Sequence, residues 1–406
     1  MPEYPGVYIE ELPSGPHSIP GVPTAVPALL GYTEKAVEHE SGSPLLCRPY
    51  PIASMAEYEQ AFGGAYGGAL TAPGGVRPFL RDSLSLYFEN GGGGTVWIVS
   101  AGDYAALESD MAGGTLAPAR LEAALKAVGA RAGPTLVAAP EALLMGECHY
   151  RAFAGAMLSQ AAALGDRFVI LDVPGDPSDG LAPVKSFQEA LEPLGRDRSF
   201  GAAYFPPLRL SSAKTLVPPS GAVLGAIFAQ DRNRGVWKAP SNLALKGVSG
   251  PAVAIGNREQ EAMNAPANGV SVNPIRSFAG DGTLIWGART LDSASGEYRY
   301  IPVRRFANYV EQSLKAGLEP FAFEPNDARA WTAAKAMIEN FLTTLWRQHA
   351  LMGAKPEEGF YVAVGLGKTM TAQDILEGRM IVEVGMAVVR PAEFILLRFM
   401  QRTAPP

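Results

Sequence analysis

The chain has 406 residues, of which 47% are hydrophobic and 18% charged, and its formal net charge is −6. This length is sufficient for two domains or one large one, and the negative charge excludes the basic footprint of a nucleic-acid-binding protein. No apolar run approaches the ~18 residues that a membrane span needs, and we expect no signal peptide at the Met1-Pro2-Glu3 start. Cys47 and Cys148 are too few for a disulfide framework, so we expect a reduced protein made in the cytoplasm that does not insert into a membrane.

The first 22 residues are rich in proline, with prolines at positions 2, 5, 13, 16 and 20. Proline at this density favours an extended arm over a helix. Val7–Leu12 is the only part of this segment that we expect to form a strand. A disordered terminus is the alternative interpretation.

The next hundred residues contain short elements that are separated by glycine and proline. Thr24–Gly31 is short and apolar and predicts a strand, and a short helix is expected from Met55. Arg81–Glu89 has too many apolar residues for a narrow stripe, so we expect a well-buried helix. Gly91–Gly94 ends this helix before a strand at Thr95–Ser100.

From Pro118 onward, predicted helices and strands alternate. Strands that are spaced by helices of this length are typical of an α/β layer with a largely parallel sheet. The expected helices are Pro118–Gly129, one that ends near Leu164, Pro183–Leu194 and Ser220–Ala229, and the expected strands are Thr135–Ala139, Arg167–Val173 and Ala202–Phe205.

The region Trp237–Gly282 has little regular pattern and much Gly, Pro and Asn, so we interpret it as the passage between two domains. Tyr300–Gly317 then predicts an amphipathic helix with Gly317 at its cap. The apolar face of this helix consists of Val303, Phe306, Val310 and Leu314.

A further helix is expected from a cap at Asn326 to about Leu351. Its basic and polar residues Arg329, Asn340 and Arg347 lie on the face opposite the core, with Lys335 and Glu339 toward one flank. The expected core stripe consists of Trp331, Ala334, Ile338, Phe341, Leu342 and Leu345.

The last forty residues predict three strands, at Phe360–Val364, Arg379–Val384 and Glu393–Met400. Pro391 cannot donate to a ladder, so it marks the start of the last strand. An apolar strand so near a terminus is an aggregation hazard unless something pairs with it. A neighbouring copy of the same chain is the obvious partner.

Several signals of chemistry are present but incomplete. Gly365–Thr369 reads GLGKT, yet Val362 stands where a phosphate-binding P-loop needs glycine and a strand is expected to follow, so a β-turn is the better interpretation. Glu141 and Asp172 each follow an apolar strand, where open α/β sheets place ligands. No partner residue is tied to either acid by a recognisable spacing, and acids at strand ends also cap the following helix.

The remaining candidates also lack a complete constellation. The four histidines are scattered without metal-ligand spacing, and Glu147-Cys148-His149 is on a predicted helix, where adjacent side chains point in different directions. We therefore predict no catalytic residues, no cofactor and no metal, and a protein that is not an enzyme.

Motifs at both ends and through the C-terminal half resemble the contractile tail sheath proteins, the family of contractile phage tails, R-type bacteriocins and related extracellular injection systems. Their order and number carry this resemblance, since none is decisive alone. The matching residues are Pro5-Gly6-Val7-Tyr8, Glu10-Glu11, Trp237–Asn242, Asn273–Arg276, Trp286–Leu291, Val303–Arg305, Phe323–Asn326, Thr371, Asp374, Ile375, Gly378, Glu383–Gly385 and Pro391–Phe394.

This resemblance implies an α/β fold (α+β overall) with two domains and two extended arms. The implied parts are an N-terminal arm at 1–22, an outer α/β domain at 23–248, an inner α/β domain at 249–386 and a C-terminal arm at 387–406. The arms are expected to add strands to the inner-domain sheets of neighbouring copies. The residues expected in these strands are Val7, Tyr8, Ile9, Glu10, Phe394, Ile395, Leu396 and Leu397.

The resemblance also implies a structural function. The chain is expected to polymerise helically around an inner tube and to contract, driving the tube through a target envelope. The implied partners are other copies, the inner tube protein, and baseplate and terminal cap proteins, in a phage tail or a phage tail-like particle. The alternative from a different class is an α/β enzyme that binds a phosphorylated ligand at its strand-end acids or its Gly-Lys-Thr loop.

In this family a helix of the inner domain faces the tube, whose surface tends to be acidic. The resemblance therefore implies that Arg329, Lys335 and Arg347 face the tube. Arg329 and Arg347 are 18 residues apart, so on a helix both project on one side over roughly 27 Å. An ordinary solvated helix face is the alternative.

Overall fold

The computed structural model describes residues 19–67, 77–111, 113–213 and 215–393. These residues form two compact units, which we describe separately. The large unit comprises Pro23–Tyr309 and the described residues from Arg390 to Glu393, and the small unit comprises Val310–Val389 with the described residues up to Val22.

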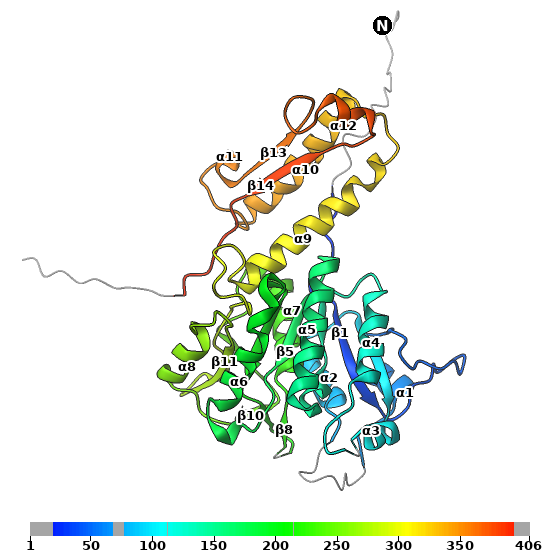
Figure 1. The fold of residues 1–406 in the computed structure, drawn as a ribbon, viewed down its shortest axis with the longest axis vertical. Coiled ribbons are helices and arrows are strands. Elements are labelled where there is room, and N and C mark those ends of the chain that lie inside the picture. Colours follow the sequence, from blue (N-terminus) through cyan, green and yellow to red (C-terminus); the bar gives the residue numbers. More distant parts are fainter. Residues whose placement is uncertain (1–18, 68–76, 112, 214, 394–406) are drawn as a thin grey trace, which may run out of the picture. The chain divides into compact units, whose positions relative to one another are not determined.

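A nine-stranded sheet is the framework of the large unit, with strand order β2-β3-β1-β4-β5-β6-β11-β12-β9. Its strands β1, β5 and β11 are labelled in Figure 1. The six strands from β3 to β11 run parallel. At one edge β2 pairs antiparallel with β3, and at the other β12 pairs antiparallel with β11 and β9 pairs antiparallel with β12. The bounds of these strands are β1 Pro27–Thr33, β2 Tyr50–Ile52, β3 Val96–Asp103, β4 Leu136–Ala138, β5 Phe168–Asp172, β6 Gly201–Phe205, β9 Leu243–Ala244, β11 Asn273–Phe278 and β12 Gly282–Ile285.

Helices cover both faces of this sheet, because its central strands are apolar on both sides. In β1, Leu30 and Tyr32 point into one core and Leu29 into the other. The first core is closed by α3 Tyr104–Asp110, α4 Ala119–Gly129, α5 Glu147–Leu164 and α6 Ala182–Leu191, and the second by α1 Met55–Phe62, α2 Leu80–Glu89 and α7 Ser220–Arg234. The remaining elements are α8 Asn257–Asn264, a small sheet of β7 Leu208–Leu210, β8 Leu216–Val217 and β10 Val248–Pro251, and the 3-10 helices η1 Pro140–Leu144, η2 Pro177–Asp179 and η3 Glu192–Phe200.

Helices α2 and α7 pack against each other unusually closely, and glycine makes this possible. A Cβ atom at Gly221 of α7 would collide with the carbonyl oxygen of Ser83, and one at Gly225 would collide with that of Tyr87. Two glycines four residues apart lie on one helix face, so this face admits the backbone of α2.

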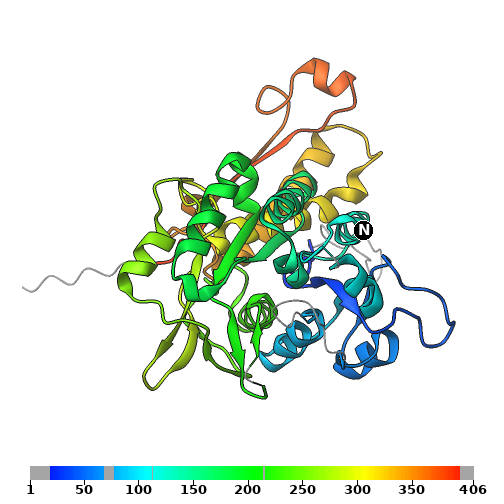
Figure 2. The same ribbon diagram turned by 60° about the horizontal axis from the view of Figure 1, so that its bottom comes forward.

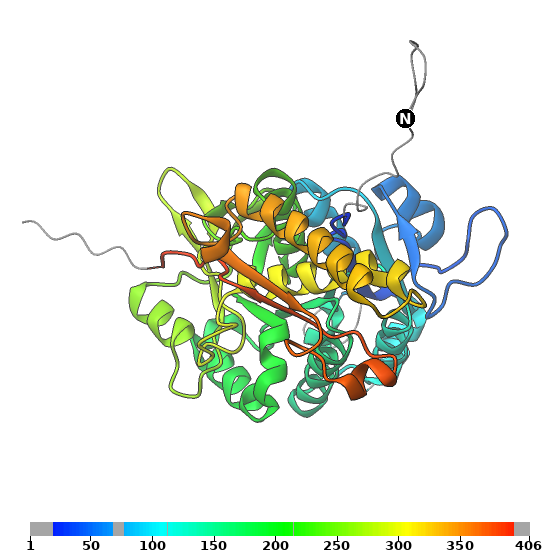
Figure 3. The same ribbon diagram turned by 90° about the horizontal axis from the view of Figure 1, so that it is seen from above.

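The small unit contains the second half of α9 Ile301–Leu318, which begins in the large unit, and a helix packed on a hairpin. In Figure 3, α10 Ala328–Arg347 runs alongside the antiparallel pair β13 Phe360–Val364 and β14 Val382–Met386. The unit also holds η4 Glu319–Phe321, α11 Pro356–Gly359 and, in the connection between β13 and β14, α12 Ala372–Leu376 (Figure 2).

The predicted α/β fold class is confirmed, and most predicted elements lie within a few residues of observed ones. The structure divides the chain differently from the expected boundary at 248/249, since the large unit continues to Tyr309. Trp237–Gly282 is a passage only in part, because β9 and the whole of β11 lie in it and belong to the main sheet. Short elements such as β2, α3 and α12 were not predicted.

Two predictions on helices are wrong in detail. The first half of α9 is buried on all sides rather than on one stripe, as its polar residues Arg304, Arg305 and Asn308 show. The N-cap of α10 is Asp327, whose side chain accepts hydrogen bonds from the amides of Arg329 and Ala330. The Asn326 side chain instead accepts a hydrogen bond from the Trp331 indole.

The two predicted arm strands, Val7–Leu12 and Glu393–Met400, lie outside the described residues except for Glu393. No helix within the described ranges is both long enough and apolar enough to cross a membrane.

Candidate functional site

The outward face of α10 is a narrow stripe of small and polar residues with an arginine near each end. Its buried face, with Ile338 and Leu342 at the centre, packs toward β13. Arg329, Asn340 and Arg347 are exposed, as the sequence predicted. Thr332 and Thr344 lie on the same stripe, and their hydroxyls donate hydrogen bonds to backbone carbonyl oxygens of the same helix. The charges of the stripe are therefore concentrated at the two arginines.

Lys335 has a different environment from the two arginines. It is half-buried, and its ammonium lies 3.5 Å from a carboxylate oxygen of Glu339 one helical turn later. This i,i+4 pair offsets the charge of Lys335 locally. The predicted basic trio is thus on one helix, and among the described residues Arg329 and Arg347 form no ion pair, whereas Lys335 does.

The second candidate surface is the hairpin of β13 and β14. Val362 pairs with Val384 and Val364 with Val382, so these alternate residues form the face toward α10. In the described part of the chain, β13 and β14 pair only with each other, so each has an open edge. Open edges present unpaired backbone donors and acceptors and are templates for a further strand.

The outward face of the same hairpin is shaped by Tyr361 and Gly385. The Tyr361 ring lies so close over Gly385 that a Cβ atom there would overlap it, which explains the glycine in this strand. The Tyr361 hydroxyl donates a hydrogen bond to Glu383, and this bond raises the pKa of the tyrosine. The Tyr361 side chain, which belongs to β13, thus contacts two residues of β14 on the face away from α10.

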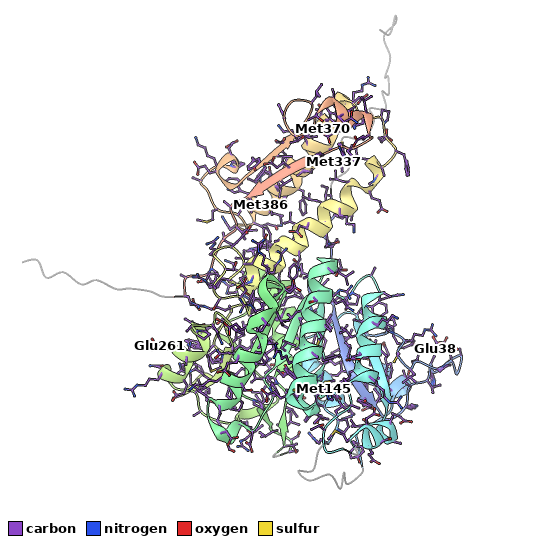
Figure 4. The ribbon with its side chains drawn as sticks, viewed as in Figure 1. Glu38, Met145, Glu261, Met337, Met370 and Met386 are labelled. Atoms are coloured by element: carbon purple, nitrogen blue, oxygen red, sulfur yellow. The ribbon has the colours of Figure 1, made fainter. Side chains whose placement is uncertain are left out.

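The methionines of the small unit differ in their burial. Met337 of α10 and Met370, just after β13, are both buried, whereas Met386 at the end of β14 is only partly covered (Figure 4). Beyond β14 the chain remains tied to the small unit, because the amide of Ala387 donates to the carbonyl of Gly359 and the carbonyl of Ala387 accepts from the amide of Met352.

The GLGKT segment forms a tight turn, as predicted. The amides of Lys368, Thr369 and Met370 all point to the carbonyl oxygen of Gly365. Because these amides are turned inward, they do not form the outward cradle of a phosphate site. The helix that follows is α12, which is five residues long and begins with a capping box between Thr371 and Asp374.

Glu141 and Asp172 are buried and cap helices, but not the helices that follow them in sequence. Glu141 accepts hydrogen bonds from the amides of Phe79 (3.0 Å) and Leu80 (2.7 Å) at the start of α2, and Asp172 accepts one from Ser220 (2.8 Å) at the start of α7. Burial raises the pKa of each carboxyl to about 7, against the opposing effect of these bonds.

The position of Glu141 also bears on ligand binding. The main sheet reverses its order at β1, which has β3 on one side and β4 on the other, and such a switch point is where doubly wound sheets bind ligands. There the Glu141 carboxyl fills the space that a side chain at Gly31 would need. The N-terminus of α2, which would attract an anionic ligand, is thus occupied by the chain's own carboxylate. Among the described residues, no cluster of three His, Cys, Asp or Glu side chains is placed to hold a metal.

Two buried arginines hold the segments next to the two predicted arms. Arg305 of α9 contacts Asp231 of α7 and the carbonyl of Thr24, just after the predicted N-terminal arm. Arg289 contacts Glu393, just before residues 394–406. Both arginines are in matched motifs of the sequence, but their partners are distant, so sequence reasoning missed these contacts.

Exposed apolar residues of the small unit were also missed. Phe323 is fully exposed and has a φ of 75°, a backbone conformation that is unusual for a bulky residue. Leu376 of α12 and Leu366 near the end of β13 are exposed as well. Sequence periodicity gives no signal for such positions, because they lie in turns or in a very short helix.

A model of the phage tail sheath C-terminal domain matches residues 293–402. The tail sheath protein of Vibrio phage KVP40 is 24% identical over 173 residues, which are 42% of this chain and 25% of that protein. The chain therefore spans about a quarter of the length of that relative.

Solved structures extend the likeness over the whole chain. A chain in the helical sheath of the anti-feeding prophage (AFP), in the contracted state, is 33% identical with a TM-score of 0.73, covering 99% of this chain and 100% of that one. A chain in the contracted sheath complex of an extracellular contractile injection system, PVC, is 32% identical with a TM-score of 0.73, covering 99% and 98%. A chain in the AFP baseplate is also 33% identical with a TM-score of 0.73, covering 99% of this chain and 100% of that one.

These likenesses place the chain in the contractile-sheath class. The protein belongs to the contractile tail sheath family.

Proposed function

We propose that this protein is the repeating subunit of a contractile sheath. It polymerises helically around an inner tube and contracts to drive the tube through a target envelope. The observation that carries this proposal is the likeness over the full chain length, at 32–33% identity, to chains of contracted sheaths. The similar chains are structural sheath proteins, and no specific observation favours the alternative of an enzyme that binds a phosphorylated ligand.

The open edges of β13 and β14 support polymerisation by strand addition. In this proposal the distal parts of the N-terminal arm (residues 1–22) and of the C-terminal arm (residues 387–406) of neighbouring copies pair with these edges, since Val22 and Ala387 make contacts within their own subunit. Backbone hydrogen bonds supply affinity in such contacts, and the alternating side chains supply register. Because the contact joins two different surfaces, it is head-to-tail and produces an open filament rather than a closed dimer.

The outward stripe of α10 is proposed as the tube-facing surface. Arg329 and Arg347 supply exposed positive charge there, and the small side chains between them allow close approach to a partner. Lys335 contributes less, because Glu339 is its neighbour. A complementary acidic tube surface would orient the sheath subunit, with each copy adding a small increment.

The large unit is proposed as the outer part of the sheath and the small unit as the inner part. A two-faced α/β core of this kind is closely packed and deforms little. Contraction would therefore move whole subunits against each other while the strand contacts of the arms keep them connected. The free energy would be stored in the contacts of many identical copies rather than in covalent chemistry.

The remaining partners and the location follow from the class of particle. The similar AFP chains come from a sheath and from baseplates, and we propose that baseplate and terminal cap proteins contact the ends of this sheath. The protein would be made in the cytoplasm and assembled into a phage tail or a phage tail-like injection particle.

Negative-stain electron microscopy of the purified protein tests the proposal. We expect rods, rings or helical polysheath that sediment as large assemblies. A preparation of discrete single particles at every concentration and salt condition, alone and with its tube protein, would contradict a sheath subunit.

A further inference from the structure

The carboxylate of Glu393 is held by a cluster of polar groups on the large unit. Arg289 donates from Nε to Oε1 (2.9 Å) and from Nη2 to Oε2 (2.6 Å), a two-point contact. Asn264 donates to Oε1 (3.1 Å) and the Tyr300 hydroxyl to Oε2 (3.3 Å). Glu393 is thus anchored on both oxygens, with the planar matching that makes arginine–carboxylate pairs geometrically specific.

Arg289 is oriented for this contact by groups that do not depend on Glu393. Its Nη1 donates to the carbonyl of Asn264 (2.8 Å), and its backbone amide donates to Oδ1 of Asn273 (2.8 Å). Its side chain is 7% exposed and that of Glu393 is 21% exposed. Burial alone would raise the pKa of Glu393, but the hydrogen bonds from Arg289 and Asn264 and the charge of Arg289 hold it below its ordinary value. The pair therefore stays ionised and is partly shielded from water.

The anchor is at a particular place in the chain. Four residues earlier, Val389 still belongs to the small unit, where its amide points to the carbonyl of Ala350. Only Arg390, Pro391 and Ala392 separate that point from Glu393. Immediately after Glu393 come residues 394–406, the distal part of the C-terminal arm. Glu393 is therefore a fixed point directly before the segment proposed to join a neighbouring copy.

We propose that Arg289 and Glu393 form a clamp that fixes the starting point of the C-terminal arm on the large unit. The arm then reaches the β13–β14 edge of a second copy from a constant origin. This inference rests on the proposed function for its consequence in assembly, but the clamp is a property of the isolated subunit. Arg289 and Glu393 act here as positioning residues and do not themselves contact the neighbour.

A released clamp would change the length of chain that can move. The origin of the arm on the large unit would then lie at Arg390 instead of directly after Glu393, and four more residues extend the reach of the arm by up to about 14 Å. A longer tether spreads its end over a larger volume and so lowers the effective concentration of the arm at its target edge. It also permits targets on other copies, so the lattice would lose register as well as yield.

The test uses the full-length chain with Glu393→Ala, Glu393→Gln and Arg289→Lys. Arg289→Lys keeps the positive charge but loses the two-point contact. Glu59→Gln is the matched control, because Glu59 pairs with Arg81 elsewhere on the large unit. Circular dichroism first checks that each variant is folded.

The first readout is the position of the arm's origin in unassembled subunits. Spin labels are attached at Ile395→Cys and at the native, exposed Cys148 of α5, with Cys47→Ser removing the other thiol. Double electron–electron resonance should give a narrow distance distribution with Glu393 present and in the control. The distribution should be clearly broader in all three clamp variants.

The second readout is assembly without labels, by sedimentation and electron microscopy at a fixed concentration. We expect the yield of ordered polymer to fall on the order of tenfold in the clamp variants, as the arm's effective concentration falls, and to be unchanged in Glu59→Gln. Unchanged distance distributions would overturn the clamp, and broadened distributions with normal ordered polymer would overturn its role in assembly. If unmodified protein forms no polymer under any condition, the proposed function fails, while the distance measurement still decides whether the clamp exists.

Discussion

Arg305 and Asp231 form a buried two-point ion pair, with Nη1–Oδ1 and Nη2–Oδ2 distances of 3.0 and 2.6 Å. Thr24 completes the group: its hydroxyl donates to Asp231 (2.6 Å), and its carbonyl accepts from Arg305 (2.9 Å). The pair therefore joins α9, α7 and the segment that leads into β1. It is the counterpart, at the N-terminal side, of the contact between Arg289 and Glu393.

Removing one partner of this pair should destabilise the protein strongly. The side chains of Arg305 and Asp231 are 3% and 5% exposed, so Asp231→Ala leaves a buried guanidinium without its counter-charge. Such losses typically cost about 3–5 kcal/mol. Urea unfolding of the unassembled protein, followed by circular dichroism, should show this decrease. The control Glu59→Ala, which removes a far more exposed ion pair, should cost at most about 1 kcal/mol.

The buried acids Glu141 and Asp172 should make stability fall as pH rises. Burial raises the folded-state pKa of each to about 7, from ordinary values of 4.5 and 3.8. The folded protein thus binds a proton that the unfolded chain releases. Their contribution is fully present below pH 4, is lost as pH rises toward about 7, and is on the order of a few kcal/mol each.

Unfolding free energies between pH 5 and pH 8 for wild type, Glu141→Gln and Asp172→Asn test this expectation. Each variant removes one titrating group while keeping an oxygen that can accept the helix amides. The difference between wild type and variant should therefore shift in favour of the variant as pH rises. Parallel curves for all three proteins would show that neither acid titrates differently on folding.

The contacts of these acids show what the sequence could reveal and what it could not. β13 was predicted with its observed bounds, because alternating residues between a glycine and a turn give a local signal. The acids were recognised at strand ends, and their role as caps was one of the alternatives. The identity of the capped helices depends on how α2 and α7 pack against the sheet, which no local pattern encodes.

Longer-range contacts and irregular segments account for the other differences. Arg289 and Glu393 are 104 residues apart, and each looks like an ordinary surface charge when its own neighbourhood is considered. The sequence of Trp237–Gly282 indicates a passage between domains because it is rich in Gly, Pro and Asn. Its strands give no periodic signal, since β9 is only two residues long and Pro274 interrupts the pattern of β11. Strands at such places are defined by their partners β12 and β6 rather than by periodicity.

Reversing the charge of the two outward arginines of α10 should weaken loading onto the tube. Exposed ion pairs are individually worth about 0–1 kcal/mol, but every copy along the tube repeats them. Co-expression of Arg329→Glu/Arg347→Glu with the tube protein should therefore give mainly empty polysheath, with the subunit still folded. The control Lys335→Gln/Glu339→Gln neutralises the neighbouring pair without changing net charge and should load nearly normally. If the arginine variant gave tube-filled particles at wild-type yield, this face would be an ordinary solvent-exposed helix face and not the tube-facing surface.

Removing either arm should abolish the ordered polymer without unfolding the large unit. The N-terminal deletion ends before Ile19, because Ile19 packs on Gly317 of α9 and Val22 donates to Ser313. The C-terminal deletion begins at Phe394 so that the contact between Glu393 and Arg289 is kept. Both truncations thus leave every described contact in place and remove only residues 1–18 or 394–406.

The two truncations should nevertheless behave differently. Residues 1–18 are rich in proline and have few large apolar side chains, so their loss should give soluble, unassembled subunits. Residues 394–400 include Phe394, Leu396 and Phe399, and a strand edge that loses such a partner is prone to nonspecific association. We therefore expect clumping in the second case. Analytical sedimentation and negative-stain images of both proteins decide the question, and ordered sheaths from either one would show that the missing arm does not connect the lattice.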